Sequence, residues 1–148
     1  MATSQKLETT TLVSLASTEL NSLANGSAAL GTEYDNGTNL WPYLSLLELN
    51  VTFGTNPTAG SLISLYLISA PDGTNYDDNV SDPMRFVGAF WLEASTSAQK
   101  KAIAPGGGQA YILLPPCKFK LRVVNGSGQS FPASGSTIKG LLTRYQQV

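Results

Sequence analysis

The sequence contains no histidine and only one cysteine, and these two shortages exclude much of the chemistry that enzymes use. Without histidine there is no Ser-His-Asp or Cys-His nucleophile, no usual zinc catalytic site and no imidazole general base. Cys117 has no second cysteine for an internal disulfide and no histidine with which to share a metal. We therefore expect a protein that is not an enzyme, with no catalytic residue, bound cofactor or metal.

Charged side chains are also scarce. They make up 13% of the 148 residues, against about 25% in an ordinary soluble domain. The net charge is -1, and no cationic run exceeds Lys100-Lys101, so we expect no nucleic-acid partner, because phosphate binding needs clustered positive charge. No apolar run approaches the ~20 residues of a membrane span. The N-terminal stretch has an early glutamate and no long apolar core, so we expect neither a secretory signal nor membrane attachment.

What the chain does have is period-two alternation of apolar and polar residues. In residues 47–53, Leu47, Leu49, Val51 and Phe53 fall on one face of an extended chain. Clusters of Gly, Pro and Asn separate such stretches and provide turns. The predicted strands are residues 9–15, 47–53, 61–68, 85–92, 99–103, 110–114, 118–125 and 138–145. This pattern predicts an all-β protein, an antiparallel two-sheet sandwich of the jelly-roll type with an extended N-terminal arm.

One domain accounts for the whole chain. We expect residues 1–17 to form an N-terminal arm or a first strand, and residues 18–148 to form a single β-sandwich domain. Residues 17–30 predict either a short helix capped by Thr18 or an irregular arm, because Asn25-Gly26 would end a helix after two turns.

Two predicted strands are apolar on both faces, which an isolated sandwich does not require. Residues 62–68 and 86–92 either lie centrally beneath covering loops or turn their outer faces toward another subunit. The low charge favours the second interpretation. The candidate residues of an oligomer interface are Leu62, Tyr66, Ile68, Val87, Ala89 and Trp91.

The stretch from Pro71 to Asp82 is acidic and invites a test for metal binding or carboxylate catalysis. Its four aspartates are Asp72, Asp77, Asp78 and Asp82. Their spacing does not match a calcium loop, which needs ligands at alternating positions and a terminal glutamate. Asp72-Gly73 is instead typical of a turn, so we interpret the stretch as a solvated connection between two strands. A hydrolase that uses Asp77 or Asp78 stays a weak alternative, since no acid–base pair is visible.

Aromatic residues offer another possible site. Trp41, Tyr43, Tyr76 and Trp91 could stack against sugar rings, as on many β-sandwich binding modules, although aromatic residues on strands more often lie in the core or an interface. A carbohydrate-binding or receptor-binding module of a phage tail, head fibre or baseplate is therefore the alternative function.

Three long stretches resemble a family of small structural proteins encoded in the morphogenesis regions of tailed bacteriophages. These stretches are "LASTELNSLANGSAAL", "LELNVTFGTNPTAGSLISLYLISAPDGTNYDD" and "LPPCKFKLRVVNGSGQSFPASGSTIKGLLTRYQQ". The resemblance implies a capsid decoration, or cement, protein: a homotrimer on the outer capsid surface of the virion, assembled in the bacterial host cytoplasm, that clamps the phage major capsid protein. It implies no catalytic residues.

On the basis of this resemblance, the N-terminal segment is the part expected to reach the coat lattice. An extended segment can pair with an exposed strand edge through main-chain hydrogen bonds, with little demand on side-chain identity. The candidate capsid contacts are Leu7, Leu12, Val13 and Leu15.

Overall fold

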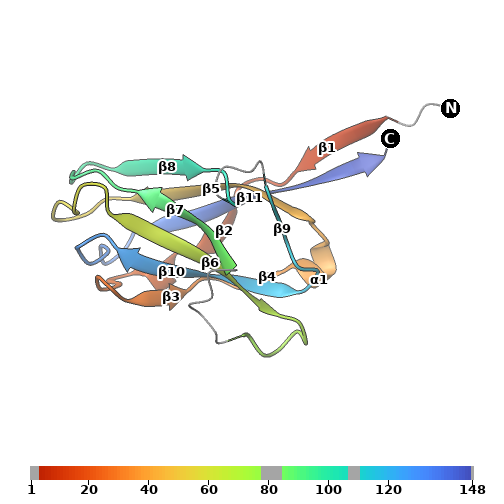
Figure 1. The fold of residues 1–148 in the computed structure, drawn as a ribbon, viewed down its shortest axis with the longest axis horizontal. Helices are drawn as coiled ribbons and strands as arrows, with labels where there is room; N and C mark the ends of the chain where they lie inside the picture. Colours follow the sequence, from red (N-terminus) through yellow and green to blue (C-terminus); the bar gives the residue numbers. More distant parts are fainter. Residues whose placement is uncertain (1–3, 78–84, 107–110, 148) are drawn as a thin grey trace.

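The computed structural model describes residues 4–77, 85–106 and 111–147. It confirms the predicted fold class: the chain forms two antiparallel sheets that pack face to face (Figure 1). The two layers below are called sheet A and sheet B.

Sheet A has the strand order β1-β11-β5-β8, with β2 also paired to β11 and β9 to β5. Its strands are β1 (Gln5–Thr9), β2 (Val13–Ala16), β5 (Tyr43–Val51), β8 (Gln99–Ile103), β9 (Ile112–Leu113) and β11 (Thr137–Gln147). Sheet B has the order β3-β10-β6-β7, with β4 paired to β10. Its strands are β3 (Ala28–Leu30), β4 (Tyr34–Asp35), β6 (Leu62–Ala70), β7 (Phe86–Trp91) and β10 (Lys118–Gly126).

The strand pairing is nested along the chain, which is what defines a jelly roll. The innermost pair is β6 with β7, followed outward by β5 with β8, β3 with β10, and β1 and β2 with β11. Successive pairs alternate between the two sheets, as if one long antiparallel ribbon were rolled up. The rolling brings the two ends of the chain together, so β1 lies beside the last strand.

The core lies between the two sheets and follows the alternation seen in the sequence. In β10, Phe119, Leu121 and Val123 are buried while Lys118, Lys120 and Arg122 on the opposite face are partly exposed. The largest side chains that are completely buried include Phe53, just after β5, and residues of both sheets such as Phe90, Phe119, Leu47, Leu49, Ile63, Leu65 and Leu121. Burial of such side chains against one another is the main favourable contribution to folding.

One buried polar residue holds the end of the sandwich where β10 meets its loops. The side-chain amide of Asn125 donates to the carbonyls of Leu23 and Gln129, both at 2.8 Å, and its oxygen accepts from the Ser127 amide at 3.0 Å. A buried amide is stable only when its hydrogen bonds are made. Asn125 therefore ties the loop before β3 to the loop after β10.

The stretch from Ser17 to Leu30 is neither a two-turn helix nor a detached arm. A single 3-10 turn, η1 (Thr18–Leu20), is followed by a loop and then by β3. Thr18 is not the cap; Ser17 occupies that position, and its amide donates to the Glu19 carboxylate at 2.9 Å. Leu20 is fully buried, so this segment is part of the core.

A four-residue helix, α1 (Asn36–Asn39), was not predicted. Asp35 caps it by accepting a hydrogen bond from the Thr38 amide at 3.2 Å. The helix ends at Leu40, which adopts a left-handed conformation with φ 53°. No helix in the described residues is long and apolar enough to cross a membrane.

Candidate interaction surfaces

The aspartates after β6 are the first candidates for a metal site or a carboxylate pair, within the described residues. The described residues include no group of three or more His, Cys, Asp or Glu side chains placed to hold a metal ion. Asp72 accepts hydrogen bonds from the amides of Thr74 and Asn75 at 2.9 and 2.7 Å, and these lower its pKa, the bond from Asn75 contributing most. Asp77 forms an ion pair with Arg85. Asp78 and Asp82 lie outside the described residues, so the predicted turn is observed only for residues 71–77.

The outer face of sheet B carries exposed apolar side chains at adjacent strand positions. Leu62 is the register partner of Trp91, Ser64 of Ala89, and Tyr66 of Phe86. Trp91 is 66% exposed and Phe86 is 44% exposed, and the rings of Phe86 and Tyr66 meet edge to face, with centroids 5.6 Å apart. We call Leu62, Tyr66, Phe86, Ala89 and Trp91 the sheet B patch.

Two of the predicted interface residues do not belong to this patch. Val87 is 1% exposed and lies in the core, because β7 is bulged: Leu65 pairs with Gly88 and Tyr66 with Phe86, which leaves Val87 as an extra residue. A bulge of one residue interrupts the alternation of faces, so Phe86 rather than Val87 lies outside.

Ile68 lies on the outer face but is completely buried. Its register partner Lys120 has its ammonium 4.7 Å from the centre of the Tyr76 ring. The Asp77 amide, in the same loop as Tyr76, donates to the Ser69 carbonyl at 3.2 Å. Tyr76 and Asp77 therefore fold back over this end of the sheet, and Ile68 is not available to a partner.

The predicted capsid-contact residues fall into two groups. Leu7 and Leu12 are exposed, whereas Val13 is half-buried against the core. Leu15 is 1% exposed and belongs to the core, so it is wrong as a contact residue. The reason is that β2 pairs with β11 inside sheet A, whereas β1 and the end of β11 extend beyond the sandwich (Figure 1).

A groove that was not predicted runs along the outer face of sheet A next to β1. It has a volume of about 300 Å³ and is lined by Leu7, Thr9, Tyr43, Ser45, Tyr111, Leu141, Thr143 and Tyr145. The Tyr43 ring lies 4.4 Å from that of Tyr111 and 6.1 Å from that of Tyr145, measured between centroids. Inside the groove the hydroxyls of Ser45 and Thr143 are 2.6 Å apart. No sequence pattern indicates this groove, because its tyrosines come from three distant stretches.

The four aromatic residues proposed as a sugar platform do not share a face. The Trp41 ring packs against the core, and the Arg144 guanidinium lies over it, with Cζ 4.5 Å from the ring centroid. Tyr43 instead lies in the groove on sheet A. Tyr76 donates its hydroxyl to Glu33 at 2.6 Å. Of the four, Trp91 alone lies on the sheet B patch, so no common platform is formed.

Glu33 joins Tyr76 to β10 through a small polar cluster. Its second oxygen lies 3.0 Å from the Lys118 ammonium. The pKa of Glu33 is lowered, chiefly by the hydrogen bond from Tyr76 and next by that from Lys118. The pKa of Tyr76 is raised by burial and by its hydrogen bond to Glu33. Both shifts follow from structural contacts and point to no reaction.

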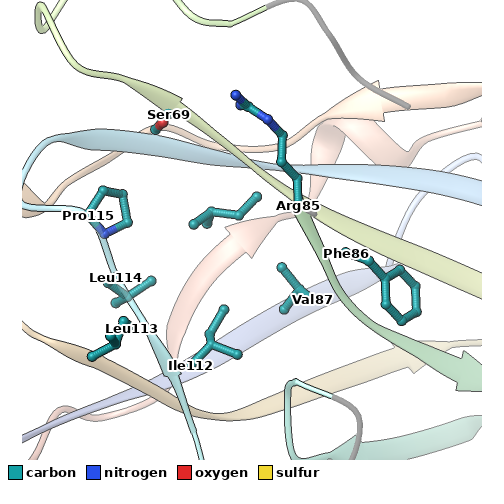
Figure 2. A pocket seen from close by; sticks show the side chains of 9 residues that line it. Ser69, Arg85, Phe86, Val87, Ile112, Leu113, Leu114 and Pro115 are labelled. Carbon is teal, nitrogen blue, oxygen red and sulfur yellow. The ribbon is translucent and has the colours of Figure 1, made fainter. Parts of the chain in front are cut away.

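A larger cavity opens between the sheets, with a volume of about 570 Å³. Figure 2 shows Val87, Ile112 and Leu114 around it, with Arg85 extending away at its edge. Among the described residues that line it, Arg85 is the only titratable one, and Asp77 already pairs with it. The described lining of the cavity is therefore mostly apolar, with Ser69 and Arg85 as its polar side chains.

No family model and no curated protein matches the chain. Two solved structures resemble it over nearly its whole length. One, titled Desmodium yellow mottle tymovirus, has a TM-score of 0.41 and 12% identity, covering 100% of this chain and 90% of that one. The other, titled turnip yellow mosaic virus, has a TM-score of 0.37 and 10% identity, covering 99% and 82%. Scores this low support no conclusion about function, and neither title names a tailed bacteriophage.

Proposed function

We propose that this protein is a non-enzymatic structural protein of a virion, a capsid decoration protein that assembles with copies of itself and stabilises the coat lattice. The observation that carries the proposal is the sheet B patch, in which Trp91 and Phe86 are exposed on a rigid sheet. Exposed aromatic residues on such a face are typical of protein interfaces. The small number of charged residues and the absence of histidine favour the same conclusion.

The sheet B patch is proposed as the interface of the homo-oligomer, with Leu62, Tyr66, Ala89 and Trp91 as its predicted residues and Phe86 added. The number of copies, three, comes from the family resemblance alone. The phage major capsid protein is the proposed partner, on the outer surface of the head, with Leu7 and Leu12 as contacts. Many weak contacts repeated by symmetry would then bind the lattice through effective concentration.

Light scattering tests the self-association. The wild-type protein should have at least three times the 15.6 kDa mass of one chain. Trp91→Ser should weaken the association roughly thirtyfold, since a buried tryptophan in an interface commonly contributes about 2 kcal/mol or more. Leu113→Ser is the matched control, because Leu113 is 71% exposed but lies outside the patch. A wild-type monomer, or equal effects of the two substitutions, would contradict the proposed interface.

Capsid binding needs its own experiment. Deleting residues 1–17 would remove β2 and with it Leu15 from the core, so the informative deletion is residues 1–9, which removes β1 alone. The shortened protein should stay folded, by circular dichroism, and should no longer sediment with capsids that lack the native protein. If the shortened protein sediments with capsids as well as the full chain does, β1 does not contribute to capsid binding.

A receptor-binding module that recognises host sugars is the alternative, and the exposure of Trp91 is the observation that favours it. A glycan array separates the two functions. Saccharide binding that is lost in Trp91→Ser would support the alternative and would count against a decoration protein.

A further inference from the structure

β1 is an edge strand in an exposed position. Beyond Thr143, which pairs with Tyr43 at the start of β5, the remaining residues of β11 pair only with β1 among the described strands. Figure 1 shows these two strands extending away from the sandwich as a ribbon. A two-stranded ribbon is marginally stable alone in water, and its free edge presents unpaired amides and carbonyls to another strand.

The direction of the main-chain groups decides how another strand could pair with β1. The Thr10 amide donates to the Leu142 carbonyl at 2.9 Å. Because amides along a strand point alternately to either side, those of Glu8 and Lys6 also face β11. The amides and carbonyls of Gln5, Leu7 and Thr9 therefore face the free edge.

The sequence of β1, Gln-Lys-Leu-Glu-Thr, is complementary to itself in an antiparallel arrangement centred on Leu7. In that register Leu7 lies opposite Leu7 of the second copy, and Gln5 lies opposite Thr9. The amides and carbonyls that face the free edge of one β1 strand can therefore hydrogen-bond to those of the other. Lys6 lies opposite Glu8 of the second copy and Glu8 opposite Lys6. Registers centred on Lys6 or Glu8 would instead bring like charges together, which is unfavourable.

On both faces of the resulting four-stranded ribbon, the side chains that meet are compatible with this register. Leu7 is the register partner of Tyr145, so two leucines and two tyrosines form one apolar row next to the groove of each copy. On the opposite face Glu8 already accepts from Arg144 at 2.7 Å, and Lys6 of the second copy would extend this pair into an alternating row of charges. In the described residues Lys6 has no ion pair of its own.

We propose that β1 is a dimerisation strand that pairs with β1 of a second copy about a two-fold axis centred on Leu7. The pairing uses the main-chain edge and leaves the sheet B patch free. It is therefore a second interface, separate from the sheet B patch. It uses the strand that is also proposed to contact the capsid, so a β1 strand paired with a second copy is not paired with the coat.

Disulfide cross-linking measures this register directly in the full chain, with Cys117 replaced by Ser throughout. Opposite residues of a hydrogen-bonded antiparallel pair are about 5.5 Å apart between Cα atoms, within the range of a disulfide. Oxidised Leu7→Cys should therefore form a covalent dimer. Gln5→Cys should not, because the two introduced thiols would be displaced along the strands by about four residues, roughly 13 Å. A mixture of Gln5→Cys and Thr9→Cys should form the mixed dimer.

A charge exchange tests the complementarity of the side chains. In the Leu7→Cys protein at low salt, Lys6→Glu alone and Glu8→Lys alone should each cross-link roughly tenfold more slowly, because each places like charges opposite each other. An equimolar mixture of the two should recover most of the original rate, since both pairs between the two β1 strands are again of opposite charge; the Glu8→Lys copy still lacks its own ion pair with Arg144.

Three results would overturn the proposal: no dimer of Leu7→Cys, equal cross-linking of Gln5→Cys, or no recovery in the mixture. The first is also the result expected if β1 pairs with a strand of a different protein. None of these outcomes bears on the mass of the oligomer formed through Trp91, so the two proposals can fail separately.

Discussion

Truncating Leu15 to alanine tests whether the N-terminal segment belongs to the core or to an arm. Leu15 is 1% exposed in the core, whereas Leu7, eight positions earlier, is 53% exposed. Strands on either side hold the Leu15 site open, so Leu15→Ala should cost about 2–5 kcal/mol of the free energy of unfolding. For a chain of this length that corresponds to a melting temperature lower by about 5–15 °C. Leu7→Ala is the control and, at a protein concentration too low for self-association, should change the stability by less than about 0.5 kcal/mol.

A second substitution sharpens this test. A Cβ atom on Gly140 would lie 2.6 Å from Cδ1 of Leu15 and 2.9 Å from Cδ1 of Leu44. Gly140→Ala alone should therefore be overpacked and cost about 1–3 kcal/mol. In the Leu15→Ala protein the new methyl group would enter the cavity instead, so the double variant should be more stable than the sum of the two changes predicts.

Urea denaturation followed by circular dichroism, at one fixed protein concentration, measures the wild-type protein and all four variants. Strict additivity, or a Leu15→Ala protein as stable as Leu7→Ala, would refute the placement of β2 in the sandwich.

Two further predictions concern backbone packing and pH. Gly31→Ala should destabilise the protein by about 2 kcal/mol or more, since its Cβ would lie 2.1 Å from the carbonyl oxygen of Leu15. Gly54→Ala is the control, because a Cβ there would have nothing within 4 Å, and it should be nearly neutral in the same denaturation assay. The lowered pKa of Glu33 means that its contacts stabilise the fold above the ordinary pKa near 4.5 and that this contribution is lost as the pH falls through the lowered value. Tyr76→Phe removes the largest cause of the shift, so the pKa of the Glu33 carboxyl should move closer to 4.5 in an NMR titration; an unchanged titration would contradict the hydrogen bond.

The alternation of apolar residues was enough to predict the main strands of both sheets. Residues 99–103 were predicted with the observed bounds of β8, and residues 118–125 lack one residue of β10. Short elements were missed for a physical reason. β3 and α1 are three and four residues long, too short for any period to be visible, and both depend on neighbours far away in the sequence.

The candidate surface could be predicted only in part, because the side of a strand on which a residue lies depends on its partner strand. Strict alternation placed Val87 outside with Trp91, but the bulge opposite Leu65 and Tyr66 turned Val87 into the core. Ile68 was placed on the correct face and is nevertheless buried, since a loop from the same chain covers it. The groove on sheet A required three tyrosines from distant stretches to meet, which no local pattern indicates.

The sequence by itself determined that this is a sandwich of alternating strands without histidine chemistry, because those properties depend on residue type and on neighbours two positions apart. Only the tertiary structure decided that β2 is core while β1 is free, and that Phe86 rather than Val87 lies outside. Those properties depend on the pairing of β1 and β2 with a strand at the opposite end of the chain, and on one extra residue in β7.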